Sequence, residues 1–184
     1  MTDAPAGRRD FAHALAAPQS GIDGVARGWL WLGLAALTGS GVFAILLVLS
    51  RTPFVNQWLP VADFFRIALV VHVNLSVLVW FVALAGTLWS MAGSGRARAL
   101  AWAALGLCTL GTASMVVSPF VEAGTPIMAN YIPVIDGRLF LSGLVLFGLG
   151  GAALVLRALH DRREALTKAA LCERLDSPAT PAAA

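Results

Sequence analysis

Four long apolar blocks, separated by short polar segments, dominate the chain. They lie at about residues 28–50, 64–91, 100–119 and 138–159. Each is close to the ~20 residues that an α-helix needs to cross a hydrocarbon core. None of them shows the apolar–polar alternation of a half-buried β-strand. We therefore expect an all-α fold, a polytopic membrane protein whose four transmembrane helices form a bundle over residues 27–160.

The two ends of the chain lack such apolar blocks. Residues 1–26 contain Arg8 and Arg9 but no apolar run with a small-residue cleavage site, so we expect a cytoplasmic N-terminal extension and no signal peptide. Residues 161–184 begin charged and end rich in proline and alanine. That composition predicts a disordered cytoplasmic tail.

The basic residues predict how the helices are oriented in the membrane. One predicted side carries most of them: Arg8, Arg9, Arg27, Arg96, Arg98, Arg157, Arg162, Arg163, Lys168 and Arg174. The other side carries only Arg51, Arg66 and Arg138, all at helix borders. Because loops rich in lysine and arginine stay in the cytoplasm, both termini are expected inside, in a bacterial inner (cytoplasmic) membrane. Tryptophans near the predicted span ends are expected to be interfacial anchors: Trp29, Trp31, Trp58, Trp89 and Trp102.

The composition agrees with a lipid bilayer as the main partner and excludes several function classes. The chain is 58% hydrophobic and 12% charged, which is too few charges to cover a soluble domain of this size. A net charge of +3 with no basic stripe argues against nucleic-acid binding. Cys108 and Cys172 have no CxxC spacing and lie at different predicted depths, so no disulfide or zinc site is expected.

His72 is the one mid-span candidate for chemistry, roughly 12 Å below the outer end of the second span. Helical periodicity places it on one face of the helix, on which most side chains after the histidine are small. The residues of this face are Leu69, His72, Ser76, Val79, Ala83, Gly86 and Ser90. Such a face accepts either a neighbouring helix or the flat face of a macrocycle. The imidazole is either a neutral group bonded to a serine or carbonyl, or a metal or haem ligand. Asn74 points to another side of the helix and is expected to bond a different helix.

Three segments resemble haem-copper oxidase subunit I, including nitric oxide reductase-like members. VVHVNLSVLVWF (70–81) is similar to the family's second transmembrane helix, in which a histidine binds the low-spin haem. LLVLSRTP (46–53) and MANYIPVIDGRLFLSGLVLFGLG (128–150) resemble the end of its first helix and the start of its fourth. The resemblance covers only the first four helices of a family that normally has twelve.

The resemblance implies a haem b whose iron is bound by His72. Arg66, at the span boundary, would then neutralise a propionate or else is a snorkelling interfacial arginine. Ser76 and Gly86 lie on the haem-facing side. The copper and high-spin haem ligands belong to later helices, so this chain is not expected to be a complete oxidase. The implied function is an integral membrane electron-transfer protein, an oxidoreductase component at most.

Several points stay open at this stage. The second iron ligand is expected from a second copy of the chain, in a homodimer or higher homo-oligomer, or from a larger oxidase-like subunit, with Met115 and Met128 as intrachain alternatives. A quinone or a periplasmic cytochrome is the expected electron-exchange partner. The competing functions are a split-oxidase or accessory subunit of a respiratory complex and a cofactor-free structural membrane subunit.

Overall fold

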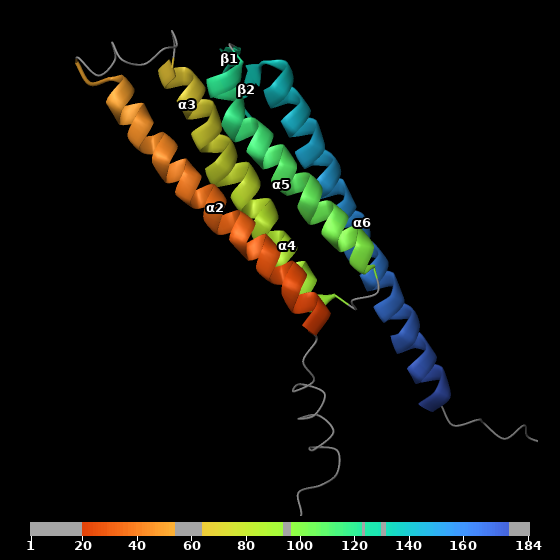
Figure 1. The fold of residues 1–184 in the computed structure, drawn as a ribbon. Coiled ribbons are helices and arrows are strands. Elements are labelled where there is room, and N and C mark those ends of the chain that lie inside the picture. Colours follow the sequence, from red (N-terminus) through yellow and green to blue (C-terminus); the bar gives the residue numbers. More distant parts are fainter. Residues whose placement is uncertain (1–19, 54–63, 94–96, 123, 130–131, 177–184) are drawn as a thin grey trace, which may run out of the picture.

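The computed structural model describes residues 20–53, 64–93, 97–122, 124–129 and 132–176. In chain order the elements are α2 (Ser20–Ser50), α3 (Phe64–Val73), the π-helical segment η2 (Asn74–Val79), α4 (Trp80–Ala92), α5 (Arg98–Val121), β1 (Thr125–Ile127), β2 (Val134–Asp136) and α6 (Arg138–Asp176). Helices α3, η2 and α4 are one continuous rod (Figure 1).

Within the described residues, four helical stretches are long and apolar enough to cross a membrane: Gly24–Ser50, Phe64–Ala92, Arg98–Val121 and Arg138–Cys172. The four predicted spans are therefore confirmed as apolar helices, the pattern of a multi-pass membrane protein. Large apolar side chains such as Trp31, Val48 and Leu149 point outward, as they do in a bilayer. Which end of each helix faces the cytoplasm stays a prediction.

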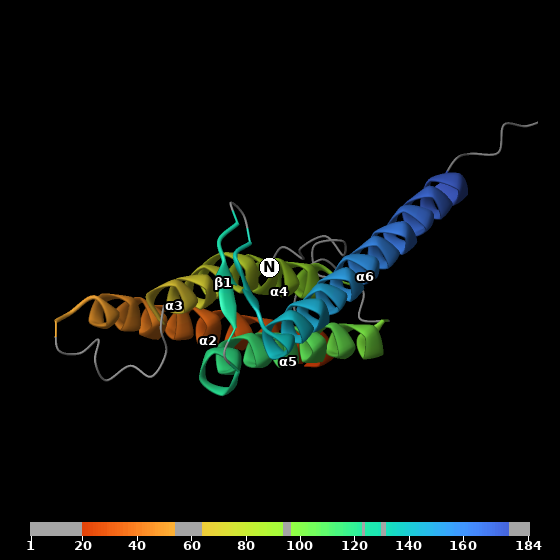
Figure 2. The ribbon, with the colours of Figure 1, turned by 90° about the horizontal axis from the view of Figure 1, so that it is seen from above.

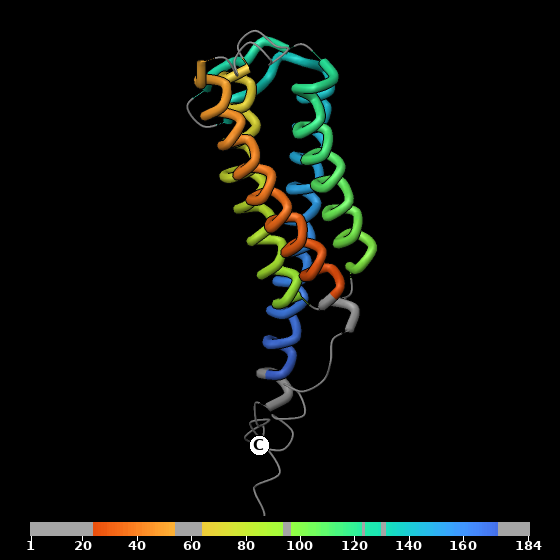
Figure 3. Tube along the Cα trace, turned by 60° about the vertical axis from the view of Figure 1, so that its left-hand side comes forward, coloured from red at the N-terminus to blue at the C-terminus, as the bar shows by residue number. Residues whose placement is uncertain are grey.

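The helices form two packed layers (Figure 2). Helix α2 packs along α3 and α4, and α5 packs along α6. The start of α2 lies at the same end of the molecule as the end of α4 and the start of α5, while the hairpin β1–β2 lies at the opposite end (Figure 3). Consecutive rods are thus antiparallel, as short connections require.

The α5–α6 contact depends on glycines that let the two backbones approach closely. A Cβ added at Gly111 would lie 2.5 Å from the Gly143 carbonyl oxygen, and one added at Gly150 would lie 2.6 Å from Cys108 Sγ. In lipid the hydrophobic effect does not drive apolar helices together. Small residues such as these allow the close van der Waals packing that holds the helices in contact.

Four predictions about the fold need correction. Residues 161–176 are not a disordered tail, because α6 continues to Asp176. The segment is rich in good helix formers and carries the ion pair Arg157–Asp161 at i,i+4 spacing. Residues 20–26 of the predicted extension likewise belong to α2, whereas residues 1–19 and 177–184 lie outside the described residues.

The expected all-α fold also contains one short antiparallel hairpin, pairing Thr125 with Asp136 and Ile127 with Val134. Its β-branched residues favour strands, and Ile135 is 1% exposed against the helices. The fourth correction concerns Trp29, whose ring is buried between helices and is not an interfacial anchor. Trp31, Trp89 and Trp102 are exposed, and Trp58 lies outside the described residues.

Candidate functional site

His72 lies near the end of α3 and is held by Ser40 in the middle of α2. Its Nδ1 is 2.9 Å from the Ser40 hydroxyl oxygen and 2.9 Å from the Ser40 carbonyl oxygen. The hydroxyl in turn donates to the His72 carbonyl at 3.2 Å. The two residues therefore form a reciprocal link between α2 and α3.

This geometry assigns the imidazole tautomer. A carbonyl oxygen only accepts hydrogen bonds, so the proton of a neutral His72 must be on Nδ1. Nε2 then carries the free lone pair, and no partner for it occurs among the described residues. The fully buried side-chain nitrogen and oxygen atoms without a hydrogen-bond partner in that part of the chain are Trp29 Nε1, Asn74 Oδ1 and Arg157 Nε. Because Nε2 is not among them, it keeps some exposed surface on this single chain.

The small-residue face below His72 packs against α2. A Cβ added at Gly33 would lie 3.3 Å from the Ala83 Cβ, and one added at Gly86 would overlap the buried ring of Trp29. The small side chains allowed either a neighbouring helix or the flat face of a macrocycle to cover this face, and in the structure a neighbouring helix covers it. Gly86 therefore has no free space for the flat face of a cofactor in this chain.

The two other predicted site residues lie apart from Nε2. The Ser76 hydroxyl donates to the His72 carbonyl at 2.8 Å, one turn back in its own helix. Arg66 is exposed near the start of α3. Beside it, the guanidinium of Arg51 lies 4.0 Å from the centre of the Phe65 ring, a cation–π contact that the sequence did not reveal.

The alternative iron ligands lie on other elements than His72 and Ser40. Met115 is 1% exposed in α5, and its backbone nitrogen lies close to Gly143 of α6. Met128 is 52% exposed beyond β1. Within the residues that the structure describes, no three histidine, cysteine or acidic side chains gather as a metal cluster. A single imidazole is thus the metal-ligating group that this site offers.

Asn74 begins the π-helical segment and ties it to the hairpin. Its Nδ2 donates to the carbonyls of Val70 and Pro133, both at 2.8 Å. The expected bond to a different helix is therefore replaced by one to the segment before β2. The side chain is 2% exposed, and its Oδ1 has no partner in the described chain.

The same residue lines a groove of about 320 Å³ on the outside of the α3–α4 rod. Among the described residues, the lining apart from Asn74 is apolar: Val73, Val77, Leu78, Phe81, Val82 and Ile132. Hydrophobic periodicity could not indicate this groove, since it assumes a regular α-helix and the groove follows a π-helical stretch.

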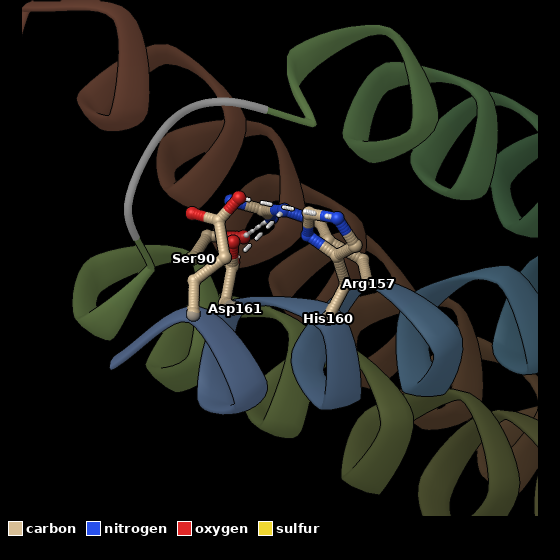
Figure 4. Close-up of polar contacts among 5 residues, drawn as sticks. Ser90, Arg157, His160 and Asp161 are labelled. Atoms are coloured by element: carbon tan, nitrogen blue, oxygen red, sulfur yellow. Dashed lines mark hydrogen bonds and ion pairs between the residues drawn. The ribbon is translucent and has the colours of Figure 1, made fainter. Parts of the chain in front are cut away.

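A buried arginine joins α4 to α6 at the opposite end of the bundle (Figure 4). Arg157 is 3% exposed, its Nη1 lies 3.1 Å from the Ser90 hydroxyl, and its Nε lies 3.7 Å from Asp161. His160 projects from the same turn toward Glu164, at 4.0 Å, and is 58% exposed. The sequence placed Arg157 among the charges of the predicted cytoplasmic side and did not indicate its burial.

Comparison with known proteins gives one distant relative and no described function. The chain is 29% identical over 149 residues to an uncharacterized protein of Rickettsia prowazekii (strain Madrid E). The match covers 68% of this chain and 29% of that protein, so this chain spans less than a third of its relative's length. No protein-family model and no solved structure matches the chain.

Proposed function

We propose that this chain is a haem b-binding membrane protein of electron transfer, in which Nε2 of His72 is an axial iron ligand. The observation that carries the proposal is the bond from Nδ1–H to the Ser40 carbonyl. Metal-ligating histidines typically donate their other ring N–H in this way, which fixes the tautomer and turns the basic nitrogen toward the metal.

The residues fit such a group only at the surface of this chain. Trp29 fills the space beside Gly86, so a macrocycle has no room on the α2-facing side. His72 is half-buried, and Nε2 retains exposed surface. A haem held here would therefore lie between this chain and another protein, either a second copy or a larger oxidase-like subunit.

The chain's own residues would position one ligand. Ser40 holds the imidazole through its hydroxyl and its carbonyl, which limits rotation of the ring. The Ser76 hydroxyl donates to the His72 carbonyl, which therefore receives two hydroxyl donors, one from Ser40 and one from Ser76. When bound, a haem b would supply one-electron cycling of its iron, with a potential set by the axial ligands and the dry surroundings.

A visible spectrum of the purified full chain tests the proposal. Reduced-minus-oxidised spectra should show Soret and α bands that disappear in His72→Ala and persist in His160→Ala, since His160 is exposed at the far end of the bundle. Native mass would show one haem shared by two chains if a second copy supplies the other ligand. Bands of equal size in the wild type and in a folded His72→Ala variant would overturn the assignment.

A second candidate is a structural membrane subunit without a cofactor, favoured by the packing of α2 against Ala83 and Gly86 of the small-residue face. In that case Ser40 and His72 are an interhelical hydrogen-bonded pair. Purified protein that is colourless, fully helical and destabilised by His72→Ala would support this candidate.

A further inference from the structure

A groove of about 380 Å³ lies between the end of α4 and the part of α6 that extends beyond the bundle. Helix α6 continues well past the end of α4, so that one wall of the groove is longer than the other (Figure 1). Trp89, Ala92 and Gly93 line the groove from α4. The lining from α6 is Ala158, Asp161, Arg162, Glu164, Ala165 and Lys168.

The charge pattern of α6 places this groove at the level of the lipid head groups. Residues 139–156 carry no charge, and from Arg138 to Ala158 the helix rises about 30 Å, the thickness of a hydrocarbon core. Arg162 lies one turn further on, about 6 Å beyond Ala158. Trp89 is 42% exposed in the same groove, and the tryptophans of transmembrane helices concentrate at this level. Phospholipid head groups are therefore the molecules that meet the groove in a bilayer.

The two acidic side chains of the lining contact basic side chains of their own helix. Asp161 lies 3.7 Å from Nε of Arg157, which is buried beside the groove (Figure 4). Glu164 lies 4.0 Å from His160. Both acids thus already act as acceptors for groups of the protein.

The two basic side chains of the lining are available to a ligand. Arg162 and Lys168 are exposed, and neither forms an ion pair within the described part of the chain. Counting Arg157, three cations stand against the acids Asp161 and Glu164, which leaves an excess of one positive charge with His160 neutral. A guanidinium and an ammonium at head-group level are the donors that bind phosphate oxygens.

We propose that this groove binds the head group of an anionic phospholipid, whose phosphate contacts Arg162 and Lys168. Its glycerol and the start of its acyl chains would lie against Trp89 and Ala92, which form the apolar wall on α4. A head group that carries its own ammonium is disfavoured, because that second cation would meet the positive excess of the groove. The proposal goes beyond haem binding and does not depend on it.

The test is a competition between two lipids with the same acyl chains and a phosphodiester each. The purified full chain in detergent is offered equal amounts of phosphatidylglycerol and phosphatidylcholine, and native mass spectrometry measures the ratio of the two in the bound fraction. Phosphatidylglycerol should be enriched severalfold. Equal binding would overturn the proposal. Millimolar inorganic phosphate should leave the ratio unchanged, since it has no acyl chain for the apolar wall, and displacement of the lipid by it would exclude a lipid site.

Two neighbouring arginines separate this site from general attraction to a basic helix. Arg162→Gln removes a cation of the lining and should lower the enrichment about fivefold. Arg163→Gln makes the same change of net charge at the next residue, which is exposed but does not line the groove, and should keep the enrichment. The same loss in both variants would contradict the assignment.

A second pair tests the groove without changing any charge. Ala165→Trp fills the groove and should abolish the enrichment, whereas Ala170→Trp, at an exposed position outside the lining, should keep it. Retention of the enrichment in Ala165→Trp would place the lipid elsewhere. All four substitutions lie in the extension of α6, whereas His72 belongs to α3, so any haem spectrum should be unchanged. Failure here is therefore distinguishable from failure of the His72 proposal.

Discussion

Trp29 determines what can lie against the small-residue face of α4. Its ring is fully buried, and the space that it occupies exists because residue 86 has no side chain. The sequence correctly placed His72, Ala83 and Gly86 on one face, since that follows from helical periodicity alone. It could not show whether a helix or a cofactor covers the face, because both require the same small residues.

Gly86→Ala tests this contact. The new Cβ would overlap the buried ring of Trp29, which would have to shift, so we expect a loss of about 1–3 kcal/mol in stability. The matched control is Gly106→Ala in α5, where an added Cβ meets nothing within 4 Å. Thermal unfolding in detergent should show a clear drop for the first variant and an unchanged or raised midpoint for the second. Equal midpoints would show that Trp29 can repack.

His72 illustrates the limit of residue-scale prediction. The sequence allowed a satisfied imidazole or an iron ligand, and the Ser40 contact is compatible with both. Ser40 itself escaped notice because a serine is common in transmembrane helices, and pairing it with residue 72 requires the register between α2 and α3. That register is set by tertiary packing and has no local signal.

At the scale of elements, helix ends and irregular turns were the least predictable features. The period of 3.6 residues gave the spans but could not reveal the π-helical segment at Asn74 or the extension of α6 to Asp176. The segment that leads into α6 is one of the polar connections between the apolar blocks, and it forms the hairpin and brings Glu122 to the start of the helix. Both carboxylate oxygens of Glu122 accept from backbone N–H groups, Leu139 at 2.7 Å and Arg138 at 3.0 Å.

This cap predicts a pH dependence. The Leu139 N–H, followed by the Arg138 N–H, lowers the pKa of Glu122 from its ordinary value of 4.5. A lowered pKa in the folded state means that the stabilisation is complete above about pH 4.5 and disappears as the pH falls through the folded value. Glu122→Gln should therefore melt below the wild type at neutral pH, with the difference shrinking toward pH 3.

The control for this cap is Asp136→Asn, which changes an exposed carboxylate in β2. Its difference from the wild type should not follow the pattern of Glu122→Gln. A constant difference between Glu122→Gln and the wild type across the same pH range would mean that the charge of Glu122 does not contribute to the cap.

At the scale of the whole molecule, the number of spans follows from the sequence because membrane thickness fixes the length of an apolar helix. The sequence does not predict that α2 pairs with α3–α4 and that α5 pairs with α6. In lipid, close packing at glycines decides which apolar helices contact each other. The structure places the β1–β2 hairpin and the far end of α6 at opposite ends of the bundle (Figure 1). The direction in which the bundle crosses the membrane is predicted only from the distribution of lysine and arginine among the connections.

Cysteine labelling tests the orientation of the bundle in the membrane with one thiol at each end of the bundle. Cys172 is exposed near the end of α6, and Met128→Cys would add a thiol at an exposed position beside β1. If both termini are cytoplasmic, a membrane-impermeant maleimide added to spheroplasts should label Met128→Cys but leave the wild type unlabelled. Inside-out vesicles of the wild type should be labelled at Cys172, while buried Cys108 stays unreacted in both preparations. Labelling of wild-type protein in spheroplasts would reverse the orientation and place the outer half of α3, with His72, toward the cytoplasm.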